Sequence, residues 1–267
     1  MVNWAFFLLS CGLSWLFWIP AALSGQDVNT TLWLIPYFLG GFGPSVVGVT
    51  IIYRLRGRDG LRDLWYRIVE FRRISIGWYV FIALIFPILF GFSVLLYNLI
   101  DHAAPGFGGV DAIQANPIIL IRLLLVGIVT GPLAEEPGWR GFALEQLQKR
   151  WTPLISSIVL GLIWVIWHIP LFLLNGTTQY QWGIGTAAFW LFVVEGAALS
   201  ILFTWVYNHN RRSVLSAILL HFAYNFTLGL VYPFSPRFYL YEVTLMCFAT
   251  LVVVQVEDRR SRYPSSD

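Results

Sequence analysis

The feature that most restricts the fold of this chain is a series of eight apolar stretches, each about 20 residues long. A helix of that length crosses the roughly 30 Å hydrocarbon core of a bilayer. Backbone groups in lipid must be paired within the segment, and the alternating pattern of a membrane barrel is not visible. We therefore expect an all-α, polytopic membrane helix bundle. The expected spans are 3–24, 32–53, 76–100, 118–135, 153–174, 184–207, 214–232 and 238–256.

Composition agrees with this class. Hydrophobic residues make up 58% of the chain and charged residues only 12%, whereas a soluble domain has roughly 25% charged residues. No repeat, low-complexity tract or second domain is visible, so residues 1–267 are expected to form a single integral membrane domain. The segment 55–74 carries apolar residues at helical spacing among arginines, which predicts an amphipathic helix in the membrane interface that acts as a lipid anchor.

Positive charges alternate between connections and so predict the orientation of the bundle. Arginines crowd the connection between the second and third stretches, and further Lys and Arg follow the fourth, sixth and eighth. The connections 25–31, 101–117 and 175–183 contain neither residue. By the positive-inside rule both termini and the arginine-rich connections lie in the cytoplasm, which requires an even number of spans. The net charge of +3 is then a product of topology and needs no nucleic-acid partner.

Ionisable side chains inside the spans are the candidates for chemistry, because each costs at least about 2.5 kcal/mol to insert unless it is paired. Glu135 and Glu136 end the fourth stretch, and as neighbours on a helix they point about 100° apart. They can therefore have different partners. On a continuous helix Glu136 reaches Arg140 one turn on. The fifth and seventh stretches each contain a histidine, His168 and His221.

Pro137 follows the two glutamates directly. It cannot donate to the carbonyl of Leu133, and it disfavours helical backbone at Glu136. The stretch therefore either persists as a helix or breaks here and starts a new amphipathic helix over 142–147, and we favour the break. Irregular backbone at membrane depth is tolerated only inside protein or beside water, so we expect a hydrated cavity at the glutamates.

The order and spacing of these residues resemble a known family. The CPBP intramembrane proteases, which include CAAX prenyl endopeptidases and bacteriocin-processing (Abi-type) membrane proteins, share three similar motifs. In this chain the motifs read Glu135-Glu136-x-x-x-Arg140, Trp164 four residues before His168, and His221-x-x-x-Asn225. The family often has Phe at the position of Trp164, a difference expected to alter packing around the histidine without removing a reactive group. The resemblance covers 131–225, within a motif-bearing catalytic core of about 118–232.

The resemblance implies an intramembrane endopeptidase that cleaves a membrane-associated, prenylated or leader-type peptide with an activated water. Glu135 would be the general base, and His168 would hold or polarise the water. His221 and Asn225, which share a helix face, would donate to the tetrahedral intermediate. The site is expected on the cytoplasmic side, where it would suit tails or leader peptides delivered from inside.

Two further carboxylates receive supporting roles. Glu136 paired with Arg140 would shape the site and offset the cost of burying the arginine. Glu195, in the sixth stretch, matches no motif, and we interpret it as a structural partner of Arg122 or of a backbone group.

Metal dependence stays open at this point. Two histidines with glutamates are an adequate ligand set for a divalent metal such as zinc, and Glu135, His168 and His221 are the candidate ligands. The family is often labelled a metalloprotease and has also been described as glutamate-dependent and metal-independent. Because the chain has no His-Glu-x-x-His helix, we expect no tightly bound structural metal.

Two other classes of function explain part of the pattern. A transporter also carries charges at mid-membrane, but the two halves lack the matching interrupted spans of inverted repeats. A non-catalytic membrane scaffold or bacteriocin self-immunity protein of the same fold is the alternative to a protease. Buried polar groups at four motif positions favour the enzyme. The expected partners are a peptide or protein substrate tail and the lipid bilayer of the cell membrane.

Overall fold

The computed structural model describes residues 4–29, 32–231 and 235–262. These residues are almost entirely helical, and they include no strand. Seven of their helices, or eight if a bent pair counts as one further span, are long and apolar enough to cross a membrane. The prediction of an all-α, multi-pass membrane protein is confirmed.

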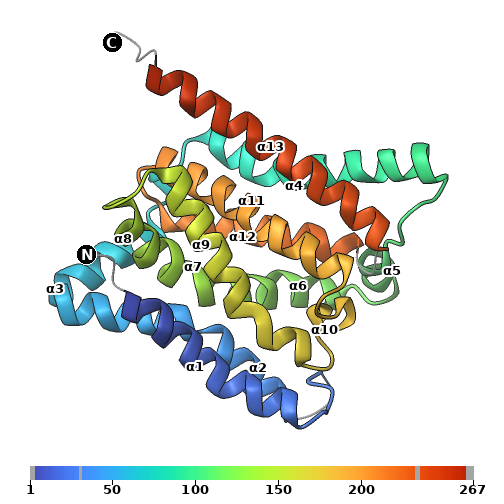
Figure 1. The fold of residues 1–267 in the computed structure, drawn as a ribbon, viewed down its shortest axis with the longest axis horizontal. Coiled ribbons are helices and arrows are strands. Elements are labelled where there is room, and N and C mark those ends of the chain that lie inside the picture. The colour runs from blue at the N-terminus through green and yellow to red at the C-terminus, as the bar shows by residue number, and fades with distance from the viewer. Residues whose placement is uncertain (1–3, 30–31, 232–234, 263–267) are drawn as a thin grey trace.

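The elements run in this order: α1 (Trp4–Leu23), α2 (Leu34–Gly41), α3 (Gly43–Val69), η1 (Phe71–Arg73), α4 (Ile76–Asp101), α5 (Gly108–Ala115), α6 (Ile118–Ile128), η2 (Val129–Leu133), α7 (Ala134–Gly138), η3 (Trp139–Ala143), α8 (Leu144–Gln148), α9 (Pro153–His168), η4 (Ile169–Leu173), α10 (Thr178–Trp182), α11 (Ala187–His209), α12 (Val214–Val231) and α13 (Pro236–Arg262). Helices α9, α11 and α12 form the centre of the bundle, with α1 and α2 on one side and α4 and α13 on the other (Figure 1).

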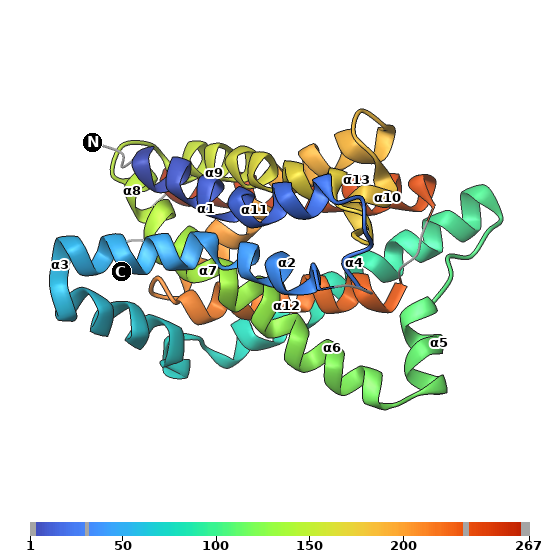
Figure 2. The same ribbon diagram turned by 90° about the horizontal axis from the view of Figure 1, so that it is seen from below.

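The second span is the bent pair, in which α2 and α3 meet at an angle of 41°. Helix α3 then reverses at Gly57, whose φ of 61° and ψ of −149° lie outside the helical region and suit a residue without a Cβ. Figure 2 shows the two halves of α3 folding back on each other. The second half is the predicted amphipathic helix, with Leu64 3% exposed and Trp65 64% exposed.

The fourth span does not break at Pro137, in contrast to the expectation from the sequence. Elements α6 to α8 form one helical span of 31 residues, Ile118–Gln148. Two π-helical turns, η2 and η3, lie on either side of α7. Such turns pair each carbonyl with an N–H five residues on, so they accommodate a missing donor without ending the helix. The Leu133 carbonyl, which Pro137 cannot serve, accepts from the Ser45 hydroxyl at 3.5 Å.

The arginine-rich connections meet at one face of the bundle. Arg67, on the second half of α3, donates to the Gly141 carbonyl at 3.1 Å and to the Tyr207 hydroxyl at 3.0 Å. It also pairs with Glu145 at 2.6 Å. We call this end, formed by residues 54–73, 145–152 and 207–213, the arginine-rich face.

The opposite end is closed by connections with few charges. The Val28 N–H donates to the Asn175 carbonyl at 3.1 Å, and the Asn29 side chain donates to the Gly176 carbonyl at 2.7 Å. We call this end, formed by residues 24–29, 102–117 and 174–186, the arginine-poor face. Figure 2 places α3 and α8 at one end of the molecule and α5 and α10 at the other. The alternation of charge along the chain thus becomes two distinct faces.

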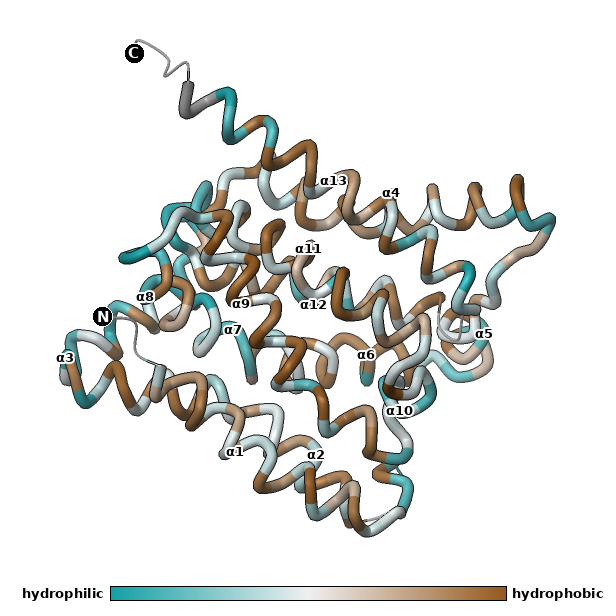
Figure 3. The backbone as a smooth tube through the Cα atoms, in the orientation of Figure 1, coloured by the Kyte–Doolittle hydropathy of each residue, from teal (hydrophilic) through white to brown (hydrophobic). Residues whose placement is uncertain are grey.

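The polar motif lies in the interior between these faces. Figure 3 shows hydrophobic residues along most of the spans, and hydrophilic residues at their ends and at α7 inside the bundle. Helix α7 packs closely on α3, because a Cβ added at Gly138 would lie 2.2 Å from the Pro44 carbonyl oxygen. This close approach holds the motif helix against the bent second span.

Candidate active site

Glu135 lies on α7 and is 6% exposed. Its Oε2 accepts a hydrogen bond from the Trp164 indole N–H at 2.7 Å. From the sequence, Trp164 was expected only to alter packing around His168. The structure gives it a second role, as a hydrogen-bond donor to Glu135. A phenylalanine at this position has no donor, so the indole N–H is a specific contact that fixes the orientation of the carboxylate.

Glu136 points away from Glu135 and binds two partners. The Arg140 guanidinium donates to its carboxylate at 3.0 Å, which is the ion pair expected from the spacing. His221 donates from Nδ1 to Glu136 Oε1 at 2.8 Å. The guanidinium carbon also lies 4.6 Å from the centre of the Phe203 ring. The supporting pair is thus joined directly to one of the motif histidines.

These contacts assign the ring nitrogens of both histidines. His221 uses Nδ1 toward Glu136, and His168 uses Nδ1 toward the Trp164 carbonyl at 2.8 Å. A donor at Nδ1 leaves Nε2 of each neutral ring with a free lone pair. Both rings also contact the Trp164 indole edge to face, with centroid separations of 5.0 Å for His168 and 5.7 Å for His221.

Gly131 marks the point at which the polar groups converge. A Cβ built on this glycine would lie 3.0 Å from Asn225 Nδ2, 3.7 Å from His221 Nε2 and 3.9 Å from Glu135 Oε1. Three motif side chains from two spans therefore face one small volume, which the missing side chain leaves open. Gly131 belongs to the π-helical turn η2, one turn before the glutamate.

A cavity of about 470 Å³ contains this point, a size typical of ligand pockets. All four predicted catalytic residues line it, namely Glu135, His168, His221 and Asn225. The remaining wall is largely aromatic, with the rings of Trp18, Tyr37, Trp164, Trp167, Trp182 and Phe192. The structure thus brings the predicted catalytic set into one cavity at membrane depth and leaves Glu136 and Arg140 buried behind it.

Glu135, His168 and His221 were the candidate metal ligands in the sequence. In the three described ranges, no group of three His, Cys, Asp or Glu side chains stands close enough to hold a metal ion. Glu135 directs one oxygen at Trp164, and it is Asn225 that accompanies Glu135 and His221 at the shared point. The side chains as arranged do not fit a metal centre.

Glu195 has partners that differ from those expected. Its carboxylate accepts from the hydroxyl groups of Tyr224 and Tyr239, on α12 and α13. The structural role inferred from the sequence is retained, but Arg122 is not the partner. Two buried tyrosines serve the carboxylate where Arg122 or a backbone group was expected, and they join three spans.

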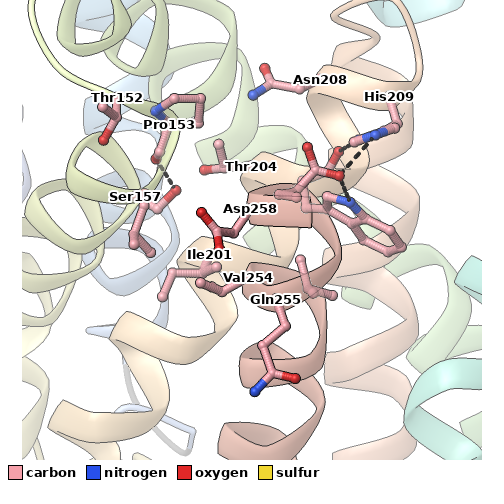
Figure 4. A pocket seen from close by; sticks show the side chains of 14 residues that line it. Thr152, Pro153, Ser157, Ile201, Thr204, Asn208, His209, Val254, Gln255 and Asp258 are labelled. Carbon is pink, nitrogen blue, oxygen red and sulfur yellow. Dashed lines mark hydrogen bonds and ion pairs between the residues drawn. The ribbon is translucent and has the colours of Figure 1, made fainter. Parts of the chain in front are cut away.

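A second cavity of about 560 Å³ lies near the arginine-rich face, between α9, α11 and α13. Figure 4 shows Thr152, Ser157, Thr204, Asn208 and Asp258 around it. None of the motif residues lines this cavity. The size of a cavity therefore does not identify the reactive site. The convergence of the polar side chains in the smaller cavity does.

Comparison with known proteins agrees with the motifs. Residues 117–227 match the family described as type II CAAX prenyl endopeptidase Rce1-like. This segment is an Rce1-like domain. The chain is also 26% identical over 227 residues to CAAX prenyl protease 2 of Methanococcus maripaludis, across 82% of this chain and 81% of that protein. The family resemblance read from the three motifs is confirmed.

Two features of the Rce1-like domain were not predicted from the sequence. The first is the donor role of Trp164, although its spacing of four from His168 already placed both side chains on one face of α9. The second is Gly131, whose missing side chain provides space at the convergence point. A glycine four residues before a buried glutamate was the available signal, since the two share a helix face.

Proposed function

We propose that this protein is an intramembrane endopeptidase of the CAAX type that hydrolyses a peptide bond of a membrane-associated substrate. The observation that carries the proposal is the convergence of Glu135, His221 and Asn225 on the space beside Gly131. Hydrolysis needs a base for water and donors for the oxyanion, and these are the groups that face that space. The Rce1-like domain adds independent support.

Glu135 is the proposed general base. Its Oε1 faces the shared space while Oε2 is held by Trp164. Glu135 accepts a proton from water as the water oxygen attacks the carbonyl carbon. It then returns the proton to the departing amine nitrogen as the C–N bond breaks. His168, on the same cavity wall, positions the water through its free Nε2.

Asn225 and His221 are the proposed oxyanion donors. The Asn225 amide donates from Nδ2, and His221 donates from Nε2 when its ring is protonated. The Glu136 carboxylate accepts from Nδ1 at 2.8 Å and so fixes the orientation of the ring. Arg140 in turn holds Glu136, so the ion pair acts on the reaction through the histidine. No step of this mechanism is routed through a metal.

The direct test is cleavage of a membrane-anchored peptide library by the purified protein in lipid, with and without a chelator. The wild type is expected to cleave. Glu135→Gln is expected to fold but to lose at least ~10²-fold in rate, as removal of a general base does. Equal cleavage by both proteins would refute the role of Glu135.

The other outcomes are equally informative. If the wild type cleaves no peptide in the library, the non-catalytic scaffold or self-immunity protein becomes the better interpretation. If the chelator abolishes cleavage and added zinc restores it, a metal takes part and the mechanism above is wrong.

A further inference from the structure

Helices α9 and α11 touch where two glycines meet. A Cβ added at Gly161 would lie 2.7 Å from the Gly196 carbonyl oxygen. About one turn further toward the arginine-rich face, at Ser157 of α9 and Ile201 of α11, the second cavity of about 560 Å³ begins, and α13 forms its third wall. This cavity contains none of the motif residues and has no role in the proposed function.

The inner part of this cavity, away from the arginine-rich face, is apolar. Its wall there contains Ile201, Val253 and Val254. The hydroxyl groups of Ser157 and Thr204 lie on the same wall, but each donates to the backbone carbonyl four residues earlier in its own helix, at 2.6 Å and 2.8 Å. Because these hydroxyl groups already have acceptors, the inner part suits an apolar chain better than water.

The cavity is open on a side of the bundle that faces lipid. Leu154 lines the cavity and is itself exposed. Ile158 and Leu162 follow it at intervals of four residues, so they share its helix face, and both are also exposed. A stripe of exposed apolar residues on a membrane span contacts acyl chains. The cavity can therefore be entered sideways from the bilayer.

The outer part of the cavity has opposite charges on opposite walls. Figure 4 shows Thr152 across the cavity from Asn208. Thr152 caps the N-terminus of α9, where a helix carries a partial positive charge. Asn208 lies in the last turn of α11, where a helix carries a partial negative charge. Helix α13 adds the carboxylates of Glu257 and Asp258 to the lining.

The two carboxylates select the kind of cation that fits. Glu257 is fixed in place, because it accepts from the Trp205 indole N–H at 3.1 Å and His209 Nε2 lies 3.2 Å from the same oxygen. Its side chain is still 43% exposed, and Asp258 is exposed beside it. Among the described residues no Lys or Arg lines the cavity. A primary ammonium brings three N–H donors to these carboxylates, whereas a quaternary ammonium brings none and an anion is repelled.

We propose that this cavity is a binding site for a phospholipid with a primary ammonium head group, phosphatidylethanolamine, from the leaflet at the arginine-rich face. The ammonium lies against Glu257 and Asp258, the phosphate lies at the N-terminus of α9, and an acyl chain occupies the apolar inner part. The head group decides which lipid binds, because a chain gains little by leaving other chains for an equally apolar groove. The inference goes beyond the proposed function and does not depend on it.

The test uses the purified, delipidated protein and native mass spectrometry with added phosphatidylethanolamine, phosphatidylcholine or phosphatidylglycerol of identical acyl chains. The wild type is expected to bind phosphatidylethanolamine at least ~10-fold more tightly than the other two, as one charge-assisted hydrogen bond allows. Asp258→Asn should lose most of this preference. Asp59→Asn is the matched control and should keep it, because Asp59 is 94% exposed on the arginine-rich face and lies outside the cavity. Equal binding of the three lipids by the wild type, or an equal loss in both variants, overturns the proposal.

The location is tested with phosphatidylethanolamine that carries a photoactivatable acyl chain, crosslinked to the wild type in vesicles. Adducts are expected in 153–157, 201–209 and 253–258, the segments that line the cavity, and an excess of ordinary phosphatidylethanolamine should remove them. Adducts confined to other spans would refute the site. Removal of the adducts by a prenylated peptide but not by phosphatidylethanolamine would assign the cavity to a substrate and so also refute the proposal.

Discussion

Trp164 contacts three members of the proposed reacting group, namely Glu135, His168 and His221. Its indole N–H donates to Glu135, its carbonyl accepts from His168, and its ring lies 5.7 Å from that of His221. The side chain does not need to touch the peptide to affect catalysis. We therefore regard it as a positioning residue, whose contribution is the orientation of the base.

Trp164→Phe is expected to keep the ring contacts and remove only the donor. Loss of a fixed orientation at the base should lower kcat by about 10- to 100-fold with KM nearly unchanged. Steady-state kinetics with a cleaved library peptide measures both constants. Trp205→Phe is the matched control, because it removes an indole bond to Glu257 outside the cavity. An equal loss of kcat in both variants would mean that the effect is structural.

Asn225 and Arg140 are expected to respond differently to truncation. Asn225→Ala removes a donor used mainly in the transition state, so turnover should fall by ~10² to 10³ with little change in KM or thermal stability. Arg140→Ala leaves Glu136 buried without its cation, at a cost of ~3–5 kcal/mol, and should reduce the folded yield. Chromatography of the folded fraction and kinetics separate the two results. A stable Arg140→Ala beside a misfolded Asn225→Ala would reverse the assigned roles.

At the scale of single elements, the π-helical turn η2 decides whether the reacting groups have space. It holds Gly131 opposite Asn225, His221 and Glu135. Gly131→Ala would place a methyl group at the convergence point. We expect the loss of at least ~10² in cleavage rate, because the water and the carbonyl can no longer occupy that volume.

The fold should survive this substitution, since alanine is the better helix former. Gly12→Ala in α1 is the matched control, because nothing lies within 4 Å of its added Cβ. Thermal unfolding should be similar for both variants while cleavage is lost only in the first. Normal cleavage by Gly131→Ala would show that the reacting atoms lie elsewhere in the cavity.

The fourth span shows why the sequence predicted the positions of the spans better than the backbone geometry within them. The length of each apolar stretch is set by the bilayer, so most span boundaries followed from hydropathy. The fourth span is the exception, because it was expected at 118–135 and continues to Gln148. The break expected at Pro137 was wrong because two π-helical turns and the Ser45 hydroxyl serve the affected backbone. Those compensations come from packing between spans, which no local pattern encodes.

At the scale of the whole molecule, the alternation of arginines predicted two faces, and the structure has them. The motif residues were also predicted to gather in one cavity, which holds for Glu135, His168, His221 and Asn225. The expected cytoplasmic side of the site stays a prediction. Motif spacing fixes the depth of a residue along its span, but the rest of the lining, such as Trp18, Asn29 and Trp182, comes from elements outside the motifs.

The burial of Glu136 and Arg140 behind the cavity has a consequence for the effect of salt. Dissolved ions screen exposed charges but act much less on buried pairs, and these two side chains are 0% and 1% exposed. Added salt should therefore weaken exposed ion pairs of the arginine-rich face, such as that of Arg56 with Asp63, and leave the pair that supports His221 intact.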